Sequence, residues 1–85
     1  MNKSEMLTIA DALVTQAREN HSRGRLSSDN LARIEGRHWH LSQTTYRVGG
    51  VRKSSLTKPS IERVVSGLVK LIEDDYVATA KAVAA

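Results

Sequence analysis

Five basic side chains between Gly36 and Ile61 could together hold an anion, because this stretch contains no aspartate or glutamate. They are Arg37, Arg47, Arg52, Lys53 and Lys58. The C-terminal quarter instead opens with three consecutive acids, Glu73-Asp74-Asp75. A chain of net charge +4 with its charges separated in this way is expected to turn one surface toward a polyanion, most commonly nucleic acid. The alternative is a basic loop that only faces solvent.

The sequence contains little that points to a metal site or to catalysis. His38 and His40 flank Trp39 and would share one face of a strand, as some metal sites require, but no third ligand lies nearby in the sequence. Consecutive acids on a helix point in different directions, and Gly49-Gly50 lacks the flanking pattern of a phosphate-binding loop. We therefore expect no enzyme activity, no metal site and no cofactor. Trp39 and Tyr46 are expected to be buried in the core or beside it.

A chain of 85 residues without phenylalanine has a thin core of leucine, isoleucine, valine and alanine, and a partner subunit would help to stabilise it. A homodimer is therefore expected. The absence of cysteine, of a signal-peptide pattern and of an apolar run of roughly 18 residues favours a cytoplasmic protein without membrane association. The sequence shows no evident site for a small-molecule ligand.

Three helices follow from the spacing of apolar residues. The first is predicted from Ser4, its N-cap, to Asn20, with Gly24 closing the turn that follows. A second helix of about two turns should begin at the N-cap Ser27 and stop at Gly36. The last should begin at Pro59 and carry an apolar stripe to Ile72. We expect a single domain over residues 1–77, and an Ala-rich helix end or frayed tail over 78–85.

The segment LSQTTYRVGGVRKSSL, Leu41 to Leu56, is compatible with two structures. A helix could start at the N-cap Ser42, with Leu41 and Tyr46 packed across the cap. Alternatively, residues 44–54 could form a β-hairpin around Gly49-Gly50, because threonine, tyrosine and valine favour strands. We favour the helix, which predicts an all-α domain of four to five helices. The alternative is an α+β fold with a hairpin wing.

The order of these elements resembles the helix-turn-helix domain of the Cro/Xre (lambda-repressor-like) family. The resemblance covers Ile9 to Leu68 and is carried by three motifs: LSSDNLA from Leu26, SQTT from Ser42 and GVRKSSL from Gly50. It implies a small DNA-binding transcriptional regulator of the phage or plasmid type, acting as a repressor. Such a protein would bind operator DNA as a dimer. The alternative is a small phage-type inhibitor or adaptor that binds another protein and has no DNA role.

Short polar side chains at the start of a helix can reach base edges in the major groove, while cations hold the phosphates. The expected base contacts are Gln43, Thr44, Thr45 and Arg47. The expected DNA backbone contacts are Ser27, Ser28, Arg37, Ser42, Arg52, Lys53 and Lys58. If the core uses the last helix only as far as Leu68, then Ile72, Tyr76 and Val77 are left for a dimer interface.

Overall fold

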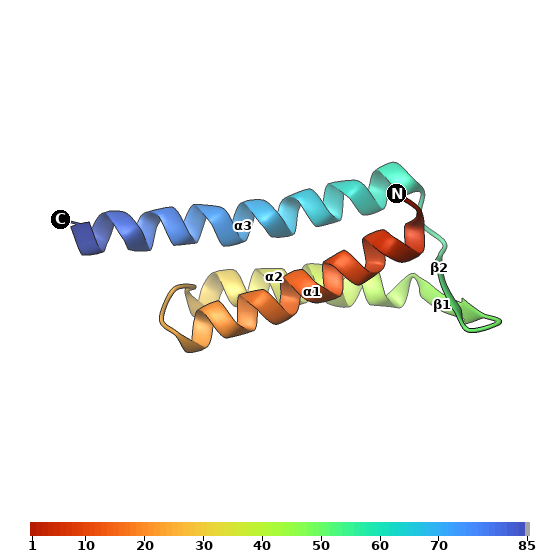
Figure 1. Cartoon of the computed structure of the whole chain (residues 1–85), viewed down its shortest axis with the longest axis horizontal. Coiled ribbons are helices and arrows are strands. Elements are labelled where there is room, and N and C mark those ends of the chain that lie inside the picture. Colours follow the sequence, from red (N-terminus) through yellow and green to blue (C-terminus); the bar gives the residue numbers. More distant parts are fainter. Residues whose placement is uncertain (85) are drawn as a thin grey trace.

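The computed structural model describes the backbone of residues 1–84 and the side chains of residues 1–74. Its elements are α1 (Lys3–Ser22), α2 (Ser28–Gln43), β1 (Thr45–Val48), β2 (Val51–Ser54) and α3 (Lys58–Ala84). The three helices lie side by side, with α2 running opposite to α1 and α3 running in the same direction as α1 (Figure 1). The two strands form a hairpin at the end of the bundle where the N-terminus lies (Figure 1).

The expected all-α domain of four to five helices is wrong, and the α+β alternative fits the chain. The strands β1 and β2 pair antiparallel, with Thr45 opposite Ser54 and Val48 opposite Val51. Gly49 and Gly50 form the turn with φ of +57° and +80°, a conformation that glycine adopts without strain and that a type I′ turn requires. Strand-favouring residues on both sides of such a turn outweigh the capping pattern at Ser42.

The predicted end of the second helix at Gly36 is also wrong, because α2 continues to Gln43. Ile34 and Leu41 are both buried and lie two helical turns apart, so the longer helix places both in the core. Burying a leucine stabilises a fold by about 1.5–3 kcal/mol, whereas a glycine within a helix costs about 1 kcal/mol. No helix starts at Ser42, which is instead the second-last residue of α2.

The N-caps of the helices agree with the sequence at α2 and differ from it at α1. The N-cap of α1 is Asn2 rather than Ser4: its side chain accepts a hydrogen bond from the Glu5 amide, and the Glu5 carboxylate accepts one from the Asn2 amide. The N-cap Ser27 of α2 is confirmed, since its hydroxyl accepts a bond from the amide of Asn30 at 3.2 Å. Pro59 lies in the first turn of α3, as expected.

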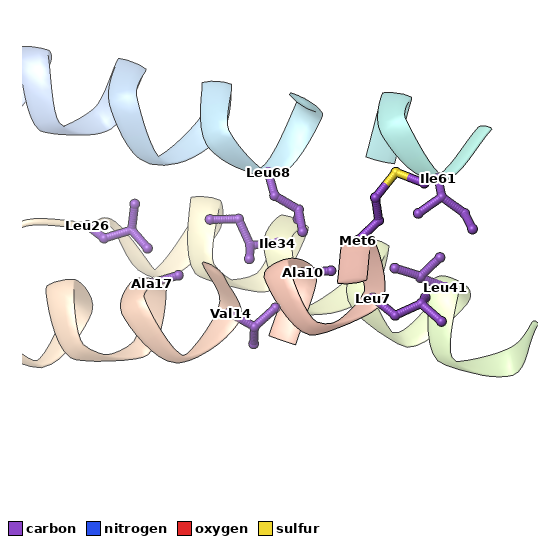
Figure 2. Packing of buried hydrophobic residues seen from close by; sticks show 10 residues of the cluster. All are labelled: Met6, Leu7, Ala10, Val14, Ala17, Leu26, Ile34, Leu41, Ile61 and Leu68. Atoms are coloured by element: carbon purple, nitrogen blue, oxygen red, sulfur yellow. The ribbon is translucent and has the colours of Figure 1, made fainter. Parts of the chain in front are cut away.

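The core lies along the common axis of the three helices (Figure 2). Its buried members are Met6, Leu7, Ala10, Val14, Ala17, Leu26, Ile34, Leu41, Ile61 and Leu68. The expected burial of Trp39 and Tyr46 is wrong, because these side chains are 58% and 51% exposed. Each lies on the outward side of its element, and aliphatic residues fill the core in their place.

Candidate nucleic-acid interface

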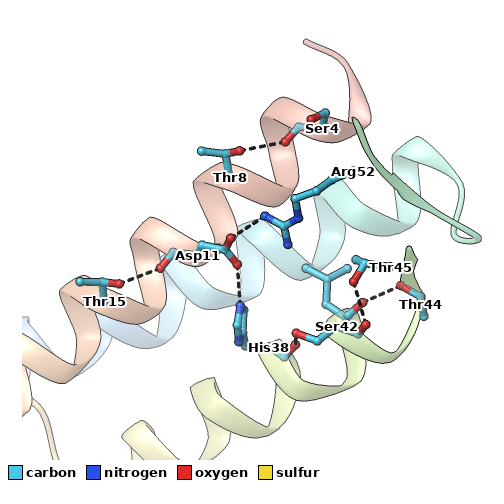
Figure 3. A network of polar contacts seen from close by, with 10 residues as sticks. Ser4, Thr8, Asp11, Thr15, His38, Ser42, Thr44, Thr45 and Arg52 are labelled. Atoms are coloured by element: carbon cyan, nitrogen blue, oxygen red, sulfur yellow. Dashed lines mark hydrogen bonds and ion pairs between the residues drawn. The ribbon is translucent and has the colours of Figure 1, made fainter. Parts of the chain in front are cut away.

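Asp11 joins the hairpin to two helices. Its side chain projects from α1 and accepts hydrogen bonds from Arg52 of β2, at 2.5 Å, and from Nε2 of His38 of α2, at 2.8 Å (Figure 3). The side chains of Arg52 and His38 are each about three-quarters buried. We call these three residues the Asp11 clasp. Because both donors approach one carboxylate, the clasp fixes the hairpin against the α1–α2 side of the bundle.

The environment of Asp11 favours its charged form. Partial burial raises the pKa of this carboxyl, but the hydrogen bonds from His38 and Arg52 and the positive charge of Arg52 lower it further, so the net shift is downward. Asp11 is therefore ionised near neutral pH and neutralises Arg52. Of the five basic residues between Gly36 and Ile61, Arg52 is thus the one whose charge is already used within the fold.

Hydroxyl groups hold the base of the hairpin. Thr44 donates to the carbonyl of Leu41 at 2.7 Å, so the buried Ser54 must donate the 3.0 Å bond between their hydroxyls. Ser54 in turn accepts a bond from the amide of Leu56 at 3.1 Å, and Thr45 donates to the carbonyl of Ser42 at 2.8 Å. Thr44 and Thr45 were expected to contact bases. Their hydroxyl groups instead donate hydrogen bonds to carbonyls in the last turn of α2.

The two faces of the hairpin differ in character. Thr45, Arg52 and the buried Ser54 lie on the inner face toward the helices, because residues opposite one another or two apart share a face. The outer face carries Tyr46, Val48, Val51 and Lys53, all of them exposed. Arg47 lies on the inner face beyond the bundle and is exposed, with only a long 3.3 Å bond to the Gly50 carbonyl. We call the outer face together with Arg47 the hairpin surface.

A shallow groove of about 440 Å³ separates the hairpin surface from the start of α1. Lys3 and Lys53 stand on its walls together with the ring of Tyr46. The Lys3 ammonium donates to the carbonyl of Ser54 at 3.4 Å, which ties the first turn of α1 to β2. Arg52 also lines the groove, which therefore combines three cations, one of them paired with Asp11, with an aromatic side chain and has no carboxylate in its lining.

A second group of cations follows the contact between α2 and α3. The guanidinium of Arg37 lies over Gly67 of α3, with Nη1 at 3.1 Å from the point where a Cβ would stand. Arg33 is one turn before Arg37 on α2, and Arg63 and Lys70 lie one turn on either side of Gly67 on α3. All four are exposed, and none pairs with a carboxylate among residues 1–74. We call them the basic seam.

The structure does not bring all the predicted contact residues together. Ser27 and Ser28 lie at the α1–α2 turn, at the opposite end of the bundle from the hairpin (Figure 1), and Ser28 is hydrogen-bonded to His21 at 3.1 Å. Gln43 is exposed at the end of α2, and Lys58 is exposed at the start of α3. Gln43 and Lys58 therefore flank the hairpin in the chain, whereas Ser27 and Ser28 lie far from it. The predicted contact residues near the hairpin are thus fewer than the sequence suggested.

The remaining predicted residues concern the partner interface and the metal. Ile72 is partly buried and packs against the core, while the side chains of Tyr76 and Val77 lie outside the described residues. The two histidines beside Trp39 do not converge: His38 turns to Asp11, and the His40 ring packs in a T-shaped arrangement with Trp39, their centroids 5.2 Å apart. Within residues 1–74, no three metal-binding side chains gather.

No family model, curated protein or solved structure matches the chain. None of the described helices is long and apolar enough to cross a membrane.

Sequence reasoning missed the Asp11 clasp and the basic seam. Asp11 stands between Ala10 and Ala12, and as the one acid in the middle of α1 it could have been paired with the basic stretch. The four-residue spacing of Arg33 and Arg37 was hidden by the expected helix end at Gly36. Both groups depend on contacts between elements far apart in the sequence, which local patterns do not determine.

Proposed function

We propose that this chain is a small DNA-binding regulator that holds duplex DNA with the hairpin surface and the basic seam. The observation that carries the proposal is the state of the cations between Gly36 and Ile61. Four of the five, Arg37, Arg47, Lys53 and Lys58, are exposed and pair with no carboxylate among residues 1–74. The fifth, Arg52, is neutralised by Asp11 and acts in the fold.

Unpaired surface cations suit phosphate binding for a physical reason. A lysine or arginine that has no carboxylate partner gives up only water when it meets a phosphate, and the DNA releases condensed counterions in return. The paired arginines Arg18 and Arg23 would first have to leave Glu35 and Glu19. The hairpin surface and the basic seam are therefore the parts of residues 1–74 best suited to a DNA backbone.

Base contact is assigned to fewer residues than the sequence suggested. Gln43 can still offer its amide to a base edge, and Arg47 can reach a guanine or a phosphate, because both are exposed. Thr44 and Thr45 are half-buried with their hydroxyls bonded to α2, so in this proposal they position Gln43 and Arg47. Sequence selectivity should consequently be modest for a single subunit.

A dimer remains part of the proposal, formed through α3. The backbone of α3 continues to Ala84, past the turn between α1 and α2 (Figure 1). Two copies joined along this helix would present two hairpins to one duplex, as expected for a phage- or plasmid-type repressor bound to a pseudo-palindromic operator. Repression would follow if the operator overlaps a promoter.

Fluorescence anisotropy with a labelled duplex at several salt concentrations tests the proposal. Phosphate contacts by Arg37, Arg47, Lys53 and Lys58 predict a slope of about −3.6 in log affinity against log salt, and each further contact from the basic seam adds about −0.9. Arg47→Ala with Lys53→Ala should reduce that slope by about 2 units. The matched control is Arg18→Ala with Arg23→Ala, which removes the same charge from paired positions and should change the slope much less.

Two results would contradict the proposal. If no duplex binds even at low salt, the DNA role is wrong. If the two double variants weaken binding equally, net charge rather than the hairpin surface drives association. The half-exposed Tyr46, Val48 and Val51 favour a second candidate in the first case, namely an adaptor that binds another protein through the outer face of the hairpin.

A further inference from the structure

The tip of the hairpin carries an apolar pair where a surface turn would normally be polar. Val48 and Val51 are the last strand residues before Gly49-Gly50, they lie directly opposite one another, and they are 54% and 52% exposed. The turn between them has no side chains, so the two valines form the leading edge of the hairpin. About half of each valine is open to solvent, and Val51 also lines the groove beside the start of α1.

Cations flank the apolar pair on both strands. Arg47 precedes Val48 on β1, and Lys53 lies two residues beyond Val51 on β2. Both are exposed, and neither pairs with a carboxylate among residues 1–74. An apolar edge between two cations complements a DNA groove, whose floor is made of stacked bases and whose walls are phosphates.

The hairpin is also held more firmly than two short strands would be by themselves. An isolated two-stranded hairpin is marginal in water, but here Arg52 is fixed by the Asp11 clasp and Ser54 by Thr44 and Lys3. The contacts of Ser54 act at the base of the hairpin and that of Arg52 acts one pair below the tip, while the tip itself projects from the end of the bundle (Figure 1). Because these contacts hold the two strands together, the exposed tip can contact a duplex while the strands stay paired.

We propose that the hairpin tip is a minor-groove wedge that bends DNA. Val48 and Val51 press against a base-pair step and partly unstack it, while Arg47 and Lys53 hold the phosphates on either side. Minor-groove proteins that insert apolar side chains in this way kink the duplex by about 20–90°. This inference rests on the proposed DNA binding and deepens it, because it specifies the groove and the deformation.

The wedge also predicts a preference among sequences that needs no base-edge hydrogen bonds. Pyrimidine–purine steps such as TA unstack easily, whereas A-tracts are stiff. The chain should therefore bind a duplex with a central TA step several-fold more tightly than an A-tract duplex of the same length. Equal affinity for the two duplexes would contradict the wedge.

Energy transfer between dyes at the two ends of a duplex of about 30 base pairs measures the bend, while anisotropy on the same samples measures binding. The test variant is Val48→Thr with Val51→Thr, since threonine keeps the shape and strand propensity of valine but is polar. We expect the wild-type chain to raise the transfer efficiency on binding. The double variant should bind within a few-fold but lose most of that rise.

The control is Trp39→Ser, which removes another exposed apolar side chain, from α2, and should leave the bend unchanged. If wild-type binds without a change in transfer, or the threonine variant bends DNA as wild-type does, the wedge is refuted and the DNA-binding proposal stands. If wild-type does not bind the duplex at all, the proposed function fails, and the wedge fails with it.

Discussion

Replacing Asp11 by asparagine should show how much the Asp11 clasp stabilises the fold. The substitution keeps the size of the side chain but removes its charge, and only one of its two terminal groups can still accept a hydrogen bond. Charge-assisted hydrogen bonds contribute about 1.5–3 kcal/mol when buried, and exposed pairs about 0–1 kcal/mol. Arg52 is 23% exposed and Asp11 45%, so the loss should lie between these cases, at about 1–2 kcal/mol.

Urea denaturation followed by circular dichroism measures this loss, and Glu35→Gln is the matched control. Glu35 of α2 also forms an ion pair with α1, through Arg18, but the side chain of that arginine is 59% exposed. The control should therefore cost less than about 0.5 kcal/mol. If Asp11→Asn is no more destabilising than Glu35→Gln, then the clasp does not fix the hairpin as inferred.

The pH dependence gives a second check on the same variant. Because the folded-state pKa of Asp11 lies below its ordinary value of about 3.9, the unfolded chain binds its proton more readily. The stability from Asp11 is therefore complete well above pH 4 and is lost as the pH falls through the folded-state value. The difference between wild type and Asp11→Asn should be largest at pH 7 and should shrink toward pH 3.

Three further changes are expected to alter the free energy of unfolding, each measurable in urea. Gly50→Ala should cost about 1 kcal/mol because φ is +80°. Gly36→Ala, in a helix with open space around it, should instead add about 0.5–1 kcal/mol, and a change of the same sign at both positions would contradict one of the two conformations. Ser54→Ala should cost about 1–2 kcal/mol, since the Leu56 amide then lacks its acceptor, and a neutral result would dismiss that bond. Ile34→Ala should cost about 2–5 kcal/mol by leaving a cavity in the core, with near-wild-type stability as the contrary outcome.

The helices were largely predictable because their signals are local. The apolar spacing in α1 and α3, the cap at Ser27 and the position of Pro59 all depend on residues within a few turns of one another. Gly36 misled the prediction because its helix-ending tendency is small compared with the burial of Leu41, which depends on contacts with other helices. Local signals decide where a helix is favoured, and packing decides how far it continues.

The hairpin and the candidate interface were harder to predict. Both structures of Leu41 to Leu56 satisfy local rules. Strand propensity beside Gly49-Gly50 favours the hairpin, and the contact of Arg52 with Asp11, 41 residues away in the chain, stabilises it further. The same contact neutralises Arg52 but leaves Lys53 unpaired, although both residues look equally basic in the sequence. Recognising which cations are already neutralised therefore requires the tertiary structure.

The hairpin has one further consequence, for the behaviour of concentrated solutions. Within the described backbone, β1 pairs with β2 alone, so its other edge offers amides and carbonyls on which a strand from a second molecule could pair. Its four-residue length and the exposed Arg47 oppose such pairing, since two copies meeting edge to edge would bring like charges together. The cation proposed to hold DNA thus also opposes edge-to-edge pairing of two molecules, and exchanging it for an apolar residue should weaken DNA binding and this opposition together.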